Sequence, residues 1–205
     1  MHSELVFYTH PLSRGGIVHW MLEEIGAPYR TEILEFGAPM KSPEYLAINP
    51  MGKVPAIRHN GQIVTEAAAI CAYLAEVFPD AGLTPEPAAR GDYYRWLFFV
   101  AGPLEMALSF NSQGLCPEPE MQARLGFGSY ESVVATLAGA LAGKRYIAGE
   151  RFSAADVYVG SHIGWGMQFG TLEKRPEFIA YWNGLKERPA HLRAVEMAAS
   201  KTDKP

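Results

Sequence analysis

The sequence has few of the residues that build disulfide frameworks or metal sites. Its 205 residues include only two cysteines, Cys71 and Cys116. They form neither a CxxC motif nor a spacing typical of metal ligands, so we expect no disulfide framework and a cytoplasmic protein. The six histidines show no HExxH-type pairing, and we therefore predict no metal site.

Long apolar runs and basic runs are also missing. No apolar stretch approaches the ~18 residues that a membrane-spanning helix needs, so no membrane partner is expected. The net charge is −4, which argues against nucleic acid or an anionic membrane surface as a partner. A content of 48% hydrophobic and 20% charged residues is ordinary for a globular protein, and the length allows one large domain or two small ones.

The first 80 residues alternate between strand and helix patterns. Leu5–Tyr8 and Tyr29–Leu34 are predicted to be short strands. Ser13–Ile25 is predicted to be a helix, because its apolar residues recur with a period of about 3.6. Gly26 then provides a C-terminal stop.

A hairpin and a further helix complete this region. Asn60-Gly61 lies between the runs Ala56–His59 and Gln62–Val64, which is the strongest short hairpin signal in the chain. Residues 67–78 are then predicted to be helical. The order β-α-β-α-β-β-α is typical of a thioredoxin-like domain, in which helices flank a small mixed sheet.

The composition changes near residue 80. Residues 79–87 hold three prolines, which is typical of a linker. Beyond them we predict no strand pair but helices, at 88–110, 119–143, 153–169, 176–188 and 190–200. The expected fold is an α+β thioredoxin-like domain followed by an all-α helical bundle, with the ranges 1–79, 80–87 (linker) and 88–205.

The start of the helix at 153–169 carries a capping signal. Ser153 can cap backbone N–H groups, and Asp156 can reach back to the N–H of the cap, in place of the commoner Glu. Phe152 and Val157 can form the hydrophobic staple across it. We interpret this motif as a stability element whose loss costs roughly 1 kcal/mol or more.

The stretch Asn49–Leu74 combines a turn, a Val54-Pro55 step, the hairpin and an acidic helix start. Proline at the lip of a strand removes a ladder donor, so the neighbouring backbone must face something other than its own sheet. An X-Pro bond also has only a small trans preference, which allows a cis peptide there. Glu66 suits the helix dipole but could equally receive an ammonium group from a ligand. Together these features predict a pocket for a small peptide-like ligand.

Four motifs give the chain a resemblance to a known family. They are NPMGKVPAI, TEAAAICAYL, FYTHPLSRGGIVHWMLEEIGAPY near the N-terminus and FSAADVYVG near the C-terminus. In this order and spacing the chain resembles a cytosolic glutathione transferase of bacterial type, with a theta- or beta-like N-terminal motif. The resemblance implies glutathione as co-substrate, a small hydrophobic electrophile as second substrate, a role in detoxification and a homodimer.

The resemblance also implies a side chain that stabilises the glutathione thiolate. Ser13 is the first candidate, because in theta-, zeta- and beta-like classes a Ser or Cys follows the first strand at this place. Its alternative is a simple helix cap. Tyr8 is the second candidate and His10 the third. One hydrogen bond to the charged sulfur, worth roughly 1.5–3 kcal/mol, would lower the thiol pKa by about one to two units.

Further residues are assigned to glutathione by the resemblance. Glu66 matches the residue that accepts the γ-glutamyl ammonium, and Val54, before Pro55, offers its backbone to the cysteinyl part as an added strand would. Ala67 stands where relatives have Ser or Thr, so one expected hydroxyl is missing and affinity is expected to fall. Cationic candidates for ligand carboxylates are Arg14, Lys41 and Lys53, with the domain interface (Arg14) or a solvated surface (the lysines) as alternatives.

The second substrate is expected between the domains, against aromatic side chains of the helical part. The candidates are Tyr94, Phe98, Phe110, Trp165 and Phe169, although most aromatics of a bundle belong to its core. The leading hypothesis is a transferase that conjugates glutathione to electrophiles. The alternatives are a glutathione-dependent peroxidase, isomerase or dehalogenase, and a non-catalytic binding protein with the same fold.

Overall fold

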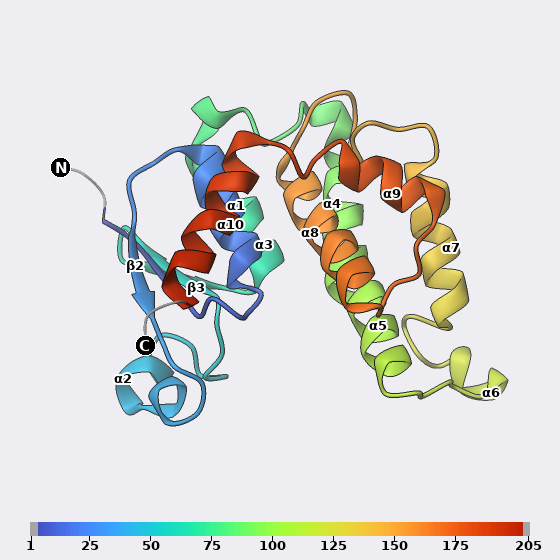
Figure 1. Cartoon of the computed structure of the whole chain (residues 1–205), viewed down its shortest axis with the longest axis horizontal. Helices are drawn as coiled ribbons and strands as arrows, with labels where there is room; N and C mark the ends of the chain where they lie inside the picture. The colour runs from blue at the N-terminus through green and yellow to red at the C-terminus, as the bar shows by residue number, and fades with distance from the viewer. Residues whose placement is uncertain (1–3, 203–205) are drawn as a thin grey trace. The chain divides into compact units, whose positions relative to one another are not determined.

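A computed structural model of the chain describes residues 4–202, coloured from blue to red along the chain in Figure 1. Contacts divide the chain into two compact units. The first unit combines the residues up to Leu83 with those from Arg188 onward, and the second unit runs from Thr84 to Glu187.

The first unit is built on a four-stranded mixed sheet. Its strands are β1 (Leu5–Thr9), β2 (Arg30–Ile33), β3 (Ala56–His59) and β4 (Gln62–Thr65), in the order β2-β1-β3-β4. β1 is parallel to β2 and antiparallel to β3, so Tyr8 lies between Glu32 and Ala56. The predicted hairpin is present, with Asn60 and Gly61 both at positive φ, as a tight two-residue turn requires.

The two faces of this sheet are covered by different elements. Because side chains alternate along a strand, Phe7 and Tyr8 point to opposite faces. Phe7 packs near His19 of helix α1 (Gly15–Ile25), with ring centroids 6.0 Å apart, and α1 also contacts α3 (Ala67–Val77). Tyr8 belongs to a buried cluster with Met40 and Tyr45, which come from the 3₁₀ turn Ala38–Lys41 and the short helix α2 (Pro43–Leu46). The predicted thioredoxin-like arrangement is therefore confirmed.

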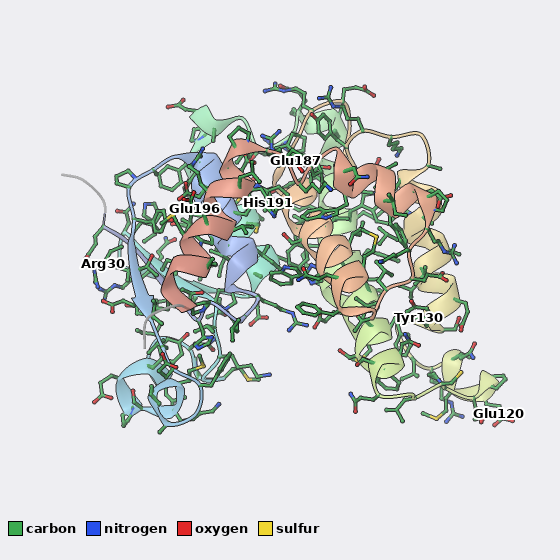
Figure 2. The ribbon with its side chains drawn as sticks, viewed as in Figure 1. Arg30, Glu120, Tyr130, Glu187, His191 and Glu196 are labelled. Carbon is green, nitrogen blue, oxygen red and sulfur yellow. The ribbon has the colours of Figure 1, made fainter. Side chains whose placement is uncertain are left out.

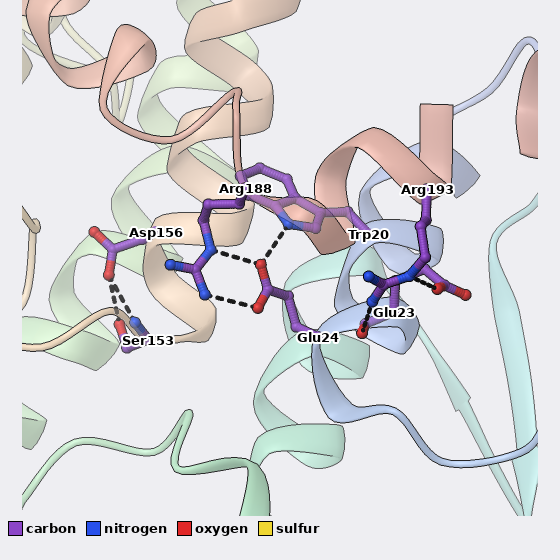
Figure 3. Close-up of polar contacts among 7 residues, drawn as sticks. All are labelled: Trp20, Glu23, Glu24, Ser153, Asp156, Arg188 and Arg193. Carbon is purple, nitrogen blue, oxygen red and sulfur yellow. Dashed lines mark hydrogen bonds and ion pairs between the residues drawn. The ribbon is translucent and has the colours of Figure 1, made fainter. Parts of the chain in front are cut away.

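The last helix, α10 (Pro189–Thr202), packs on α1 and so belongs to the first unit. His191 lies on α10 (Figure 2). Its ring packs edge-on against that of Trp20, with ring centroids 4.7 Å apart. The Arg188 guanidinium holds both oxygens of Glu24 at 2.7 and 2.8 Å, and Trp20 Nε1 donates to the same carboxylate at 2.8 Å (Figure 3). We expected residues 88–205 to form one helical domain. The structure differs because α10 covers the indole of Trp20 on α1, and Arg188, directly before α10, pairs with the carboxylate of Glu24 on the same helix.

The second unit is helical throughout its described residues. Its helices are α4 (Arg90–Phe99), α5 (Glu105–Ser112), α6 (Pro119–Gln122), α7 (Tyr130–Leu141), α8 (Ala154–Phe169) and α9 (Pro176–Asn183). Short 3₁₀ turns at Pro79–Ala81 and Pro87–Ala89 flank its start. Among the described residues no helix is long and apolar enough to cross a membrane. The predicted all-helical second part is confirmed.

Two predicted helices are interrupted in the structure. The helix expected at 88–110 contains a π-helical turn at Val100–Leu104, because Pro103 has no N–H to donate in a regular helix. The helix expected at 119–143 is split into α6 and α7. Ser129 starts α7 afresh, since its Oγ accepts a hydrogen bond from Ser132 N–H at 3.2 Å in a capping box.

The predicted capping box of α8 is present and more elaborate than expected. The N–H and Oγ of Ser153 both donate to Asp156 Oδ2, at 2.9 and 3.0 Å (Figure 3). Asp156 Oδ1 accepts from Ile147 N–H at 2.8 Å and from the Tyr181 hydroxyl at 2.7 Å. Burial raises the pKa of this fully buried carboxyl, and the four hydrogen bonds oppose the rise. Asp156 thus joins the start of α8 to a loop and to α9.

Candidate functional site

The turn between β1 and α1 places Ser13 at the N-terminus of α1. Its hydroxyl donates to the backbone oxygen of His10 at 2.6 Å and accepts from Gly15 N–H at 3.0 Å. The side chain is half-buried. Ser13 is thus held at the positive end of the dipole of α1, which is a suitable place for an anionic ligand atom.

Gly15 is required by the close packing of this turn. A Cβ at residue 15 would lie 1.9 Å from Oγ1 of Thr9 and 3.0 Å from Oγ of Ser13. Any larger residue would push the end of β1 and the Ser13 hydroxyl apart. Close packing therefore explains why glycine occupies position 15. The helical periodicity of this segment did not reveal this requirement.

His10 is fully engaged by its own neighbourhood. Nδ1 accepts a hydrogen bond from Leu12 N–H at 3.1 Å, so the neutral ring carries its proton on Nε2, which lies 3.6 Å from Glu35 Oε2. The ring stacks on Phe36 with centroids 4.0 Å apart. With its acceptor nitrogen occupied, the imidazole is poorly suited to remove a proton from a thiol.

Tyr8 lies inside the cluster on the other side of β1. It is 8% exposed, and its ring centroid lies 5.9 Å from that of Tyr45. Burial, and secondarily the neighbouring Tyr8, raise the pKa of Tyr45 to about 12. Tyr8 therefore packs as a wall of the α2 side of the sheet, whereas Ser13 stands at a helix terminus.

The Val54-Pro55 step lies next to this cluster, directly before β3, and its backbone is not part of the sheet ladder. The peptide is cis, which the sequence allowed for. Pairing between β1 and β3 begins with Tyr8 opposite Ala56, so Val54 lies outside the ladder. The carbonyl of Lys53 is fixed by two donors, the Tyr45 hydroxyl and Asn49 Nδ2, both at 2.7 Å. A short stretch of backbone is thereby held in place without a strand partner of its own.

Glu66 has an unusual backbone conformation between β4 and α3. Its φ is 66° and its ψ 116°, in a region that non-glycine residues rarely adopt and that costs of order 1–3 kcal/mol. The side chain is exposed, and Ala67, 8% exposed, starts the helix. Such strain often marks functional sites. No signal in the sequence indicated it, because Glu is an ordinary residue before a helix.

The three cationic candidates have different surroundings. Lys41 Nζ donates to the backbone oxygen of Met51 at 2.8 Å, which ties it to the loop before Val54. Lys53 is exposed beside that step, and Arg14 is exposed at the N-cap of α1. Ser13, Lys41, Lys53, Val54 and Glu66 thus all belong to the first unit.

The five aromatic candidates for the second substrate all lie in the second unit. Phe98 and Phe169 are 72% and 70% exposed, and Tyr94 is 40% exposed. Phe110 and Trp165 are half-buried, and Phe110 stacks on Phe127 with centroids 5.1 Å apart. Three of the five are therefore available to a ligand. No group of three or more His, Cys, Asp or Glu that could hold a metal ion occurs among residues 4–202.

A thioredoxin-like sheet with a cis Val-Pro step, followed along the chain by an all-helical second part, is the architecture of the glutathione transferase class. Comparisons agree: residues 16–77 match "Glutathione S-transferase, N-terminal domain" and residues 124–189 match "Glutathione S-transferase, C-terminal domain". The glutathione S-transferase GstA of Escherichia coli O157:H7 is 30% identical over 153 residues, covering 71% of this chain and 74% of the relative. The chain belongs to the glutathione S-transferase family.

Solved structures give the same result over nearly the whole chain. The theta class glutathione S-transferase from Xanthomonas axonopodis pv. citri, solved with glutathione bound, is similar with a TM-score of 0.76 and 27% identity, covering 94% of this chain and 97% of that one. A sphingomonad glutathione S-transferase complexed with glutathione also has a TM-score of 0.76 and 27% identity, covering 95% and 98%. Bacterial transferases are thus among the relatives, and several of them bind glutathione.

Proposed function

We propose that this protein is a glutathione transferase that joins the glutathione sulfur to small hydrophobic electrophiles. The observation that carries the proposal is the Ser13 hydroxyl at the start of α1, held between the His10 carbonyl and Gly15 N–H. The homodimeric state and the cytoplasmic location of the family resemblance are part of the same proposal.

The first unit offers a group for each part of glutathione. The free backbone of Val54 is suited to pair with the cysteinyl residue in the manner of an added strand. The exposed Glu66 carboxylate is suited to receive the γ-glutamyl ammonium, and the N–H groups that open α3 at Ala67 suit its carboxylate. Lys53 and Lys41 are the cations proposed for the glycyl carboxylate, with Arg14 as a further contact.

The chemical step requires the thiolate. A free thiol has a pKa of about 8.5, so only a small fraction is ionised at pH 7. If the Ser13 hydroxyl turns from the His10 carbonyl to the sulfur, the hydrogen bond and the helix terminus stabilise the anion. The proton leaves to solvent, the sulfur forms a bond to the electrophilic carbon, and the leaving group departs with its electron pair. Proximity of the two bound reactants supplies a further part of the rate.

Binding and ionisation can be tested separately. The protein should be retained on immobilised glutathione and should conjugate a chromogenic aryl halide. In Ser13→Ala the pKa of the bound thiol, followed by thiolate absorbance, should rise by about one to two units. Ser129→Ala, which removes a helix-capping serine of the second unit, is the matched control. An unchanged thiol pKa in Ser13→Ala would transfer the role to Tyr8 or His10, and failure to bind glutathione would overturn the proposal.

A second candidate function is a non-catalytic glutathione-binding protein. Two observations favour it: Ala67 has no hydroxyl for the γ-glutamyl carboxylate, and the Ser13 hydroxyl already has an acceptor at 2.6 Å. Glutathione retention without conjugation of aryl halides, and without turnover of hydroperoxides or haloalkanes, would select this candidate. Ala67→Ser should then tighten glutathione binding by about tenfold or more, because a hydrogen bond to a charged acceptor such as a carboxylate contributes about 1.5–3 kcal/mol.

A further inference from the structure

The dipeptide Asn-Gly occurs twice in the chain, at Asn60-Gly61 and at Asn183-Gly184. In this dipeptide the side-chain amide is open to attack by the next backbone nitrogen, because glycine has no Cβ to hinder the approach. The attack closes a succinimide ring and releases ammonia. Both asparagines and both glycines are exposed, so access of water does not distinguish the two copies. The difference between them lies in the backbone.

The first copy forms the turn between β3 and β4. His59 pairs with Gln62, so Asn60 and Gly61 lie outside the ladder, at φ 51° and 77°. Within the described part of the chain, no backbone hydrogen bond is formed by Gly61 N–H. Asn60 Nδ2 lies 3.4 Å from His59 Nε2, which is longer than an ordinary hydrogen bond and holds the side chain only weakly. Neither the amide nor the attacking nitrogen is thus fixed by a strong contact.

The second copy is part of a helix end. Asn183 is the last residue of α9, and Gly184 continues its helical conformation with φ −71° and ψ −14°. Gly184 N–H donates to the backbone oxygens of Ala180 and Tyr181, both at 3.1 Å. The nitrogen that would attack is therefore engaged in the helix. The last turn of α9 must open before this nitrogen can reach the side chain of Asn183.

We propose that Asn60 is a site of spontaneous deamidation in the folded protein, and that Asn183 is protected by α9. The nitrogen of Gly61 forms a bond to Cγ of Asn60, and the bond between Cγ and Nδ2 breaks. Nδ2 leaves as ammonia with the proton that the Gly61 nitrogen gives up. Water then adds to one of the two ring carbonyl carbons, and the proton returns to the nitrogen. Opening at Cγ leaves an aspartate at position 60, and opening at the backbone carbonyl leaves an isoaspartate.

The two products affect the hairpin differently. Both add one negative charge, but isoaspartate also lengthens the main chain by a methylene group. The length of a hairpin turn determines the register of its strands, so the isoaspartate weakens the pairing of β3 with β4. β4 ends directly before Glu66, and the change therefore reaches the segment that holds this residue. The deamidation itself does not depend on the proposed transferase activity.

The two copies can be compared in a single sample. The full-length protein is incubated at mildly alkaline pH, either folded or unfolded in urea, and its peptides are analysed by mass spectrometry. Digestion in ¹⁸O-labelled water marks any deamidation that occurs during digestion. In the unfolded chain both asparagines should react at similar rates. In the folded protein Asn60 should react at least about tenfold faster than Asn183, because only Asn183 requires a helix to open. Equal rates in the folded protein, or an unreactive Asn60, overturn the proposal.

Variants test the mechanism and its consequence. Gly61→Ala should slow the reaction at Asn60 by about tenfold, because a methyl group shields the attacking nitrogen. If the positive φ of Gly61 prevents this variant from folding, the comparison of the two asparagines in the wild type still decides the matter.

Amide hydrogen exchange tests the effect on the hairpin. In an aged sample the isoaspartyl peptide is separated chromatographically from the unmodified one, and its β3 and β4 amides should exchange faster. Asn60→Asp is the matched control, since it has the same added charge with an unchanged main chain, and its exchange should equal that of the wild type. Exchange that is the same in the isoaspartyl form and in Asn60→Asp would overturn the effect on strand pairing.

Discussion

The two units stabilise their most buried carboxylates in opposite ways (Figure 3). In the first unit Glu24 is 8% exposed and is held by a cation, the Arg188 guanidinium, in a two-pronged pair. In the second unit Asp156 is fully buried and is held by four neutral donors from a loop, a cap and α9. The stabilisation by an ion pair depends on one charged partner and falls with ionic strength. In a network of neutral donors, each donor contributes a part of the stabilisation, and salt has little effect on it.

The largest effect is expected from Asp156→Ala. The change removes the acceptor of Ile147 N–H, Ser153 N–H and the Tyr181 hydroxyl, which then remain buried and unsatisfied. The free energy of unfolding should fall by about 3–5 kcal/mol, measured by urea denaturation. Asp92→Ala, an exposed acid on α4, should cost no more than about 0.5 kcal/mol. Equal losses for the two variants would contradict the role of Asp156 as a network centre.

A smaller effect is expected from Arg188→Ala. It leaves Glu24 with Trp20 Nε1 as its remaining donor, and because Arg188 is 31% exposed we expect a loss of about 1.5–3 kcal/mol. Arg193→Ala breaks the more exposed pair with Glu23 and should cost no more than about 1 kcal/mol. Raising the salt concentration should reduce the difference in the free energy of unfolding between Arg188→Ala and the wild type. The corresponding difference for Asp156→Ala should not change. If the stability loss of Arg188→Ala does not depend on salt, the two buried carboxylates are not stabilised in the different ways described above.

A cap outside both carboxylate sites should cost less again. Ser129→Ala removes the side-chain acceptor of Ser132 N–H at the start of α7. The expected loss is about 1 kcal/mol by thermal or urea unfolding. Ser129→Asp, which keeps an acceptor at the cap, should restore the wild-type value, and failure to do so would show that the capping box is not what starts α7.

Acid should affect the stability of the two units differently, because His59 in the first unit and Asp156 in the second have pKa values shifted by burial. Burial lowers the pKa of His59, whose Nδ1 lies 2.9 Å from the Tyr73 hydroxyl. The unfolded chain therefore binds this proton more readily, so stability should fall as the pH drops below about 6.5 and the folded pKa is approached. The burial of Asp156 acts in the opposite sense at lower pH, because its raised pKa favours proton uptake by the folded state. His59→Gln should flatten the acid limb, and an unaltered pH profile would exclude His59 as its cause.

Local chemistry made several features of both units predictable. The Asn60-Gly61 turn, the Val54-Pro55 step and the Ser153 cap each depend on a few adjacent residues, and each is present. The positive φ of Glu66 was not predictable, because glutamate is an ordinary residue before a helix and rarely adopts this conformation. The hydroxyl bond of Ser13 to His10 is likewise a matter of turn geometry that residue types leave open.

Long-range partners were the main gap in the prediction. Residues 190–200 were correctly expected to be helical, but nothing in their periodicity says which surface they cover. Their place was determined by Trp20 and Glu24, more than 160 positions earlier in the chain. A buried acid on a helix is a weak clue, since many arginines could satisfy it.

The placement of α10 also sets an order of events during synthesis. The sheet, α1 and α3 are complete in sequence by residue 83, but their unit is discontinuous. Until residues 188–202 have left the ribosome, the indole of Trp20, 1% exposed in the folded chain, has no cover from His191. The first unit to be translated is thus the last to be finished, and a chain stopped at residue 187 would lack both the ring that covers Trp20 and the cation that pairs with Glu24.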